Sequence, residues 1–167
     1  MVCHCLLNPN AKVYPLADDH RVYAAELEPF IKAGAGLMQL PCPEVSYLGL
    51  NRWGMTKEQY EHPNFRRHCV DILRPSMDQI EAFTQAGYEI VGVFGMDGSP
   101  NCGINKTCVG FSGGEICSQS AISGQARGLK SVPGKGVFMD ILLHLLLERN
   151  INTRFYAMDE IGPTGCT

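Results

Sequence analysis

Short apolar runs alternate with longer amphipathic stretches along the chain. The segments Val2–Leu7, Gly36–Leu40, Tyr88–Met96 and Thr153–Met158 are short and mostly apolar. The first three end at turn-forming residues, which is typical of strands buried in a sheet. The pattern therefore predicts four strands, the first of which begins almost at residue 1.

Three longer segments carry a helical spacing of apolar residues. Asp19–Ala33 and Asn64–Ala86 each end at a glycine, and Val137–Arg149 is strongly apolar throughout. Because a proline inside a helix removes one backbone hydrogen bond, Pro75 is expected to break or kink the second of these helices. Helices thus separate the predicted strands.

The order of these elements predicts an α/β fold with an open, doubly wound, Rossmann-like parallel sheet. Residues 104–136 are rich in Gly, Ser and Lys and are expected to form a long excursion over the active face. No internal repeat or linker divides the chain, so residues 1–167 are interpreted as a single domain.

Composition narrows the class of protein. Hydrophobic residues make up 45% of the chain and charged residues 19%, as in a globular enzyme. A net charge of -3 gives no broad basic field, so bulk nucleic acid and anionic membranes are not expected partners. The sequence contains neither a membrane-length apolar run nor a signal-peptide pattern, and the expected location is the cytoplasm.

Eight cysteines then require an explanation. In a reducing compartment they are more readily interpreted as thiols, metal ligands or redox groups than as disulfides. Cys5, Cys42 and Cys102 each follow a predicted strand, and ligands of doubly wound folds bind beyond the carboxyl ends of the strands. These three residues are therefore predicted to meet.

Several interpretations of such a meeting stay open. Three thiolates suit an iron-sulfur cluster with one open iron, or a catalytic zinc with one open position. Buried cysteines that serve only as small hydrophobic residues are the simpler alternative. Cys3, next to His4 and Cys5, is expected to pack in the core.

Three segments together resemble the thiouracil desulfidase family. They are Cys5-Leu6-Leu7, Pro41-Cys42-Pro43-Glu44 and Ser99-Pro100-Asn101-Cys102-Gly103, and the resemblance covers about residues 1–110. The sequence departs from that family at residues 8–10, where glycine usually follows the first motif, and at Asn101, which replaces a serine. It also lacks the Arg-Tyr-Asp-Gly stretch that follows the first motif in the family.

The resemblance implies a 4Fe-4S cluster bound by Cys5, Cys42 and Cys102. It also implies that the open iron accepts sulfur from a small thiolated heterocycle, similar to thiouracil, in a non-redox hydrolysis. The expected function is accordingly that of a desulfidase enzyme. A cluster- or sulfide-binding carrier or sensor, with no organic turnover, is the main alternative, and a zinc hydrolase using the same thiolates is another.

Four further residues are candidates for the chemistry. Glu44 is the predicted general acid/base, because a partly desolvated carboxyl group can exchange protons near neutral pH. Ser99 is predicted to hydrogen-bond the substrate or to position water, and Asn8 and Asn101 are predicted to contact the substrate. A helix cap or loop carboxylate for Glu44, and a turn residue for Ser99, are the structural alternatives.

Overall fold

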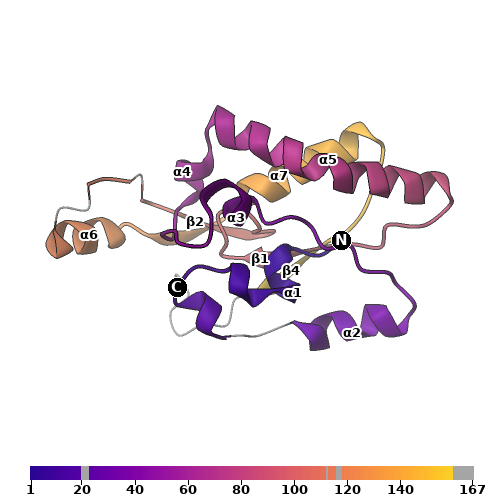
Figure 1. Ribbon diagram of the computed structural model, residues 1–167, viewed down its shortest axis with the longest axis horizontal. Helices are drawn as coiled ribbons and strands as arrows, with labels where there is room; N and C mark the ends of the chain where they lie inside the picture. Colours follow the sequence, from indigo (N-terminus) through magenta and orange to yellow (C-terminus); the bar gives the residue numbers. More distant parts are fainter. Residues whose placement is uncertain (20–22, 112, 116–117, 160–167) are drawn as a thin grey trace.

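A computed structural model describes residues 1–19, 23–111, 113–115 and 118–159 as a mixed α/β protein (Figure 1). Its helices are α1 (His4–Leu7), α2 (Ala24–Lys32), α3 (Pro43–Leu48), α4 (Lys57–Tyr60), α5 (Pro63–Gln85), α6 (Gln119–Ala126) and α7 (Val137–Glu148), together with the 3-10 turns η1 (Pro9–Ala11) and η2 (Leu16–Asp19). Its strands are β1 (Val93–Asp97), β2 (Lys106–Val109), β3 (Lys130–Pro133) and β4 (Phe155–Asp159). None of the described helices is both long and apolar enough to span a membrane.

A small parallel sheet lies at the centre. Strand β1 pairs with β4 in parallel along its whole length. On the other side of β1, Val2 forms parallel bridges to both Phe94 and Gln39. Four extended backbone segments therefore lie side by side and run in parallel, in the order 38–40, 1–3, β1 and β4.

Helices lie on both sides of these strands. Figure 1 shows α5 and α7 above the sheet and α2 below it. Helix α5 turns a single apolar stripe toward the core, since its buried residues recur every three or four positions: Phe65, Cys69, Leu73, Met77 and Ile80.

The first predicted strand is wrong over most of its length. Only residues 1–3 are extended, and α1 begins at His4. Leu6 N–H donates to the carbonyl of Cys3, and Asn8 N–H donates to that of His4, so these backbone groups close helical turns. Cys5 consequently lies in a short helix.

The predicted strand Gly36–Leu40 is reduced to an isolated bridge at Gln39, and the remaining predicted elements are found with shifted ends. Helix α5 runs through Pro75, which is exposed, so the missing backbone donor faces solvent and the helix continues. Strand β1 begins at Val93, five residues later than predicted, and α2 begins at Ala24, while residues 20–22 lie outside the described part. Helix α7 and strand β4 are confirmed.

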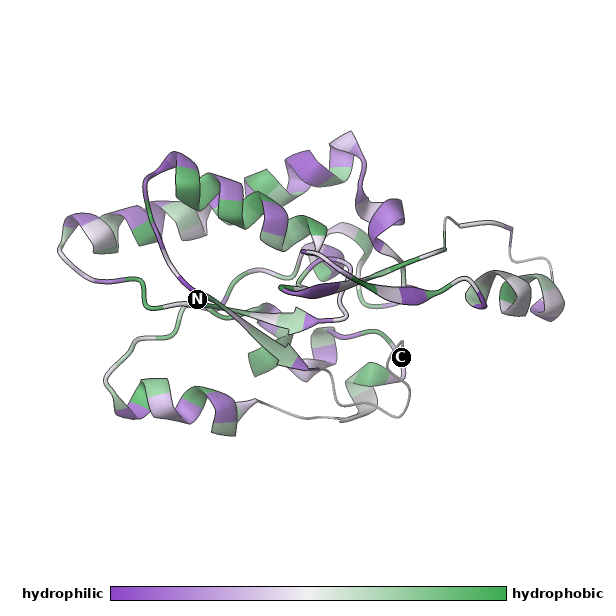
Figure 2. Ribbon diagram, turned by 180° about the vertical axis from the view of Figure 1, so that it is seen from behind, coloured by the Kyte–Doolittle hydropathy of each residue, from purple (hydrophilic) through white to green (hydrophobic). Residues whose placement is uncertain are grey.

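The excursion over residues 104–136 has structure of its own. Strands β2 and β3 form an antiparallel pair that carries α6. Figures 1 and 2 show this arm extending from one end of the molecule, with α6 farthest from the sheet. Gly110 has φ of +105° and lies against the carbonyl of Gly128, so a side chain there would collide with the backbone.

Candidate functional site

Four cysteines from distant parts of the sequence line one cavity of about 1040 Å³: Cys5, Cys42, Cys102 and Cys108. Cys5 comes from α1, Cys42 precedes α3, and Cys102 belongs to the turn after β1. Glu44 and Ser99 line the same cavity. The structure thus brings together five of the predicted site residues.

Cys42 lies at the N-terminus of α3. Its Sγ accepts a hydrogen bond from the backbone N–H of Val45 at 3.5 Å, and Pro43 occupies the first helical position. Proline suits that position, because the helix needs no backbone donor there. Burial raises the pKa of the Cys42 thiol to about 11, so the metal-free site favours the neutral thiol.

Cys102 lies in a turn that many backbone contacts hold. Ser99 Oγ accepts hydrogen bonds from the N–H groups of Asn101 at 3.2 Å and Cys102 at 2.9 Å. Asp97 Oδ1 accepts hydrogen bonds from the N–H groups of residues 104 and 105, both at 2.8 Å. Asp97 and Ser99 therefore both act as turn residues, and Ser99 does so at the edge of the cavity.

Helix α7 supports the same turn from behind. Its first N–H groups donate to the turn: Val137 to the carbonyl of Pro100 at 2.9 Å and Met139 to that of Asn101 at 3.0 Å. Gly136 lies so close to the backbone of Asn101 that a Cβ would overlap it. The unpaired N–H groups of a helix start are in this way satisfied by the loop that carries Cys102.

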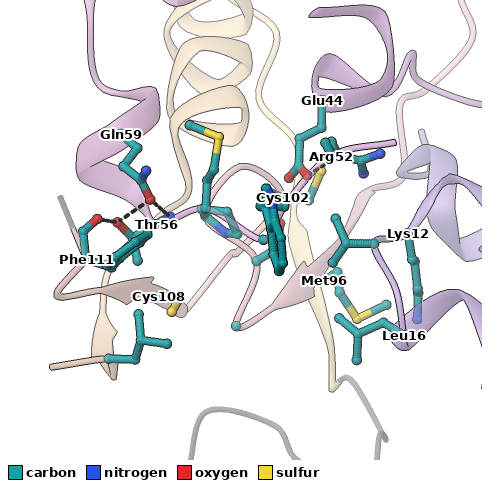
Figure 3. A pocket seen from close by; sticks show the side chains of 18 of the residues that line it. Lys12, Leu16, Glu44, Arg52, Thr56, Gln59, Met96, Cys102, Cys108 and Phe111 are labelled. Atoms are coloured by element: carbon teal, nitrogen blue, oxygen red, sulfur yellow. Dashed lines mark hydrogen bonds and ion pairs between the residues drawn. The ribbon is translucent and has the colours of Figure 1, made fainter. Parts of the chain in front are cut away.

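Glu44 links the segments that carry the cysteines. Its Oε1 accepts a hydrogen bond from Asn101 Nδ2 at 3.0 Å, and its Oε2 pairs with Arg52 Nε at 3.2 Å. Arg52 also donates to the carbonyls of Gly49 at 3.0 Å and Ala11 at 2.7 Å. Figure 3 shows Glu44 and Arg52 next to Cys102. Arg52 is a site residue that sequence reasoning missed, because no periodicity or motif marks it.

A buried tyrosine lies beside this ion pair. Tyr60 is 1% exposed, and its hydroxyl has no hydrogen-bond partner among the described residues. Burial, with a smaller contribution from the Glu44 carboxylate, raises the pKa of Tyr60. The hydroxyl therefore stays protonated beside Glu44.

The far wall of the cavity comes from the base of the arm. Cys108 on β2 lines this wall, and Figure 3 shows it apart from Cys102. Thr56 Oγ1 donates to the carbonyl of Phe111, and Gly110 N–H donates to Glu58 Oε1 at 2.8 Å. Helix α4 thus fixes the arm where it meets the cavity.

Comparison with known proteins gives one informative match. The chain is 33% identical over 106 residues to the uncharacterized protein MJ0003 of Methanocaldococcus jannaschii, covering 64% of this chain and 67% of that protein. The chain belongs to the family of that archaeal protein. No family model and no solved structure matches the chain. Because this relative is itself uncharacterized, membership of its family assigns no activity to the chain.

Two predicted substrate contacts lie away from the cavity surface. Asn8 does not line the cavity, and its side chain contacts His4 at 3.5 Å and Asn10 at 3.1 Å. Asn101 is fully buried and contacts Glu44 from behind. In this structure Asn101 positions Glu44. Cys117 and Cys166 lie outside the described residues.

Cys5, Cys42 and Cys102 line one cavity from separate segments. Among residues 1–19, 23–111, 113–115 and 118–159, no group of three or more His, Cys, Asp or Glu side chains is arranged to hold a metal ion. Thiolates are ligands of both iron-sulfur clusters and zinc, so the chemistry of the three side chains fits either group.

Proposed function

We propose that this protein is an iron-sulfur-cluster-dependent desulfidase that removes sulfur from a small thiolated heterocycle, similar to thiouracil, by non-redox hydrolysis. The observation that carries the proposal is the gathering of Cys5, Cys42 and Cys102 at one cavity together with Glu44 and Ser99. Cys5, Cys42 and Cys102 would hold a 4Fe-4S cluster. When bound, the cluster would supply a Lewis-acidic iron with a high affinity for sulfur.

The strand order supports the doubly wound fold that the proposal includes. In the order 38–40, 1–3, β1 and β4, the chain reverses its direction of winding between residues 1–3 and β1. Cys5 comes shortly after residues 1–3, and Cys102 comes after β1. Ligands of open α/β sheets bind at this kind of switch point, beyond the carboxyl ends of the strands.

The chain's own groups would bind and orient the substrate. Trp53, 70% exposed, and Met96 line the cavity and offer apolar surface to a heterocycle. Ser99 uses its oxygen as an acceptor for two backbone N–H groups, which leaves its hydroxyl proton free to point at a ligand. Glu44 is the carboxylate that would hold or move the proton of an attacking water.

Anaerobic iron, sulfide and zinc analysis with an absorption spectrum tests the cofactor. We expect about four iron and four sulfide per chain, with loss of both in Cys5→Ala, Cys42→Ala and Cys102→Ala. Cys69→Ala is the control, since Cys69 is a free cysteine that is buried in α5 and does not line the cavity. Stoichiometric zinc, or no metal after reconstitution, would overturn the cluster.

Turnover is tested on the reconstituted protein with thiouracil and other thiolated pyrimidines. We expect loss of the thiocarbonyl absorption and release of one sulfide for each oxygenated product. Ser99→Ala keeps the cysteines and should slow this release, whereas the exposed Ser120→Ala should not. A fully loaded protein that consumes no thiolated compound refutes the desulfidase.

A carrier or sensor of clusters or sulfide is the second candidate. It is favoured by one observation: both oxygens of Glu44 are already occupied by Arg52 and Asn101, as expected for a structural carboxylate. The variant Glu44→Gln and the turnover assay together separate the two functions. An intact cluster with sulfur release abolished in Glu44→Gln supports the enzyme, whereas a loaded wild type that consumes no thiolated compound supports the carrier.

A further inference from the structure

Cys3 and Cys102 lie side by side along the same edge of β1. Cys3 N–H donates to the carbonyl of Phe94 at 2.9 Å, and Met96 N–H donates to the carbonyl of Cys102 at 2.9 Å. Phe94 and Met96 are two residues apart in one strand, so their backbone groups point to the same side. The turn that carries Cys102 thus continues along the strand edge directly after residues 1–3 leave it.

Both residues are free cysteines in the same apolar core, and each thiol shifts the pKa of the other. Neighbouring positions at one strand edge suit a disulfide, because the bond forms only between cysteines whose backbones lie close together.

The two thiols differ in access. Cys102 is 9% exposed and lines the cavity, whereas Cys3 is 1% exposed and does not. A small oxidant that enters the cavity can therefore reach Cys102 but not Cys3. This is the arrangement of an attacked cysteine and a resolving cysteine.

We propose that Cys3 and Cys102 form a reversible disulfide when peroxide enters a cavity in which Cys102 holds no iron. Hydrogen peroxide oxidises the Cys102 thiol to a sulfenic acid and leaves as one water. The Cys3 thiol then attacks that sulfur, the S–S bond forms, and the hydroxyl leaves as a second water. The two thiols together lose two protons and two electrons, which the peroxide accepts.

The disulfide has two consequences for the site. It protects Cys102 from the irreversible sulfinic and sulfonic acids, because the sulfenic acid is consumed as it forms. It also removes Cys102 as a metal ligand until a dithiol reductant restores it. The pairing itself does not depend on desulfidation, whereas its effect on cluster assembly rests on the proposed function.

The test uses the full-length chain, freed of metal by a chelator and reduced, and then treated with one equivalent of hydrogen peroxide without oxygen. We expect a loss of two titratable thiols per chain and a mass decrease of about 2 Da. Fragment spectra should join Cys3, and not Cys5, to Cys102. Dithiothreitol should restore both thiols and, with them, the capacity to take up iron and sulfide.

Two variants make the test specific. Cys3→Ser, treated with at least two equivalents of peroxide, should form no disulfide and should accumulate sulfinic acid at Cys102, a mass gain of about 32 Da. Cys69→Ser, which removes another fully buried thiol, should leave the disulfide unchanged. A disulfide that joins Cys102 to Cys5 or Cys42, or sulfinic acid at Cys102 in the wild type, would overturn the proposal. Far-UV circular dichroism confirms that each variant is folded.

Discussion

Arg52 offers the sharpest test of how the site is held. Its side chain is 4% exposed and its partner Glu44 is 16% exposed, so the ion pair is largely removed from water. The variant Arg52→Met keeps the length of the side chain and removes its charge and its donors. Glu44 would then be a buried carboxylate without its cation, and the carbonyls of Ala11 and Gly49 would lose their partner.

The magnitude follows from these contacts. Removing one partner of a buried ion pair costs about 3–5 kcal/mol, because the other charge stays buried and unpaired. The amide of Asn101 still donates to Glu44, which keeps the expected cost of Arg52→Met at the lower end of that range. A loss of about 3 kcal/mol is a large part of the ~5–15 kcal/mol that stabilises a typical domain.

Urea unfolding of the metal-free protein measures this cost. The double variant Arg52→Met with Glu44→Gln should recover about 1–2 kcal/mol of it, since no unpaired charge then remains. The exposed Arg74→Met, which removes a surface pair with Asp71, is the control and should change stability by less than about 1 kcal/mol. An Arg52→Met variant as stable as this control would refute the reasoning.

Three further predictions concern the framework around the cavity. Gly136→Ala should lower the free energy of unfolding by about 1–3 kcal/mol, because its Cβ would overlap the backbone of Asn101, whereas Gly124→Ala in open space should not; thermal unfolding compares the two. Asp97→Ala should cost about 3 kcal/mol in urea unfolding, since the backbone N–H groups of the following turn lose a charged acceptor, and a loss below about 1 kcal/mol would contradict this. Burial raises the pKa of the Cys69 thiol to about 12 from an unfolded value of 9.0, so its contribution to stability is complete below pH 9.0 and is lost as the pH rises toward 12. Between about pH 8 and pH 10.5 the wild type should therefore lose roughly 2 kcal/mol more than Cys69→Ala, and equal losses would contradict the assignment.

The sequence predicted those parts of the site whose positions follow from the direction of the strands. Cys42 and Cys102 follow extended segments, and parallel strands deliver the residues after them to the same edge of the sheet. This argument predicted a shared site without any local ligand motif. It also placed Cys5 at that site, although Cys5 arrives there on α1 and not at the end of a strand.

The sequence could not show how the carboxylate is used. Arg52 follows Glu44 by eight residues, and Asn101 follows it by 57. No spacing rule predicts that side chains at these separations will bind a given carboxylate. The sequence predicts that Asn101 contacts the substrate, because Asn101 stands next to Cys102 in the motif. Its side chain turns inward instead, since Glu44 offers an acceptor there.

The boundary of the first strand failed for a related reason. Residues 2–7 have the composition of a buried strand, and composition alone does not distinguish such a strand from a short buried helix. Tertiary contacts decide between them: β1 offers backbone partners to residues 1–3, and beyond that point its edge is occupied by the turn that carries Cys102. With no partner along the sheet, the chain satisfies its own backbone by turning into α1.

This competition for one strand edge also explains why the cysteines meet. The edge of β1 is shared between residues 1–3 and the turn at Cys102, so α1 must start next to that turn. Helix α7 fixes the turn from one side, and the hydrogen bond from Asn101 to Glu44 holds the start of α3 against it from the other. Each of these contacts is made between groups of the protein itself. The arrangement of Cys5, Cys42 and Cys102 around the cavity is therefore set by contacts within the fold itself.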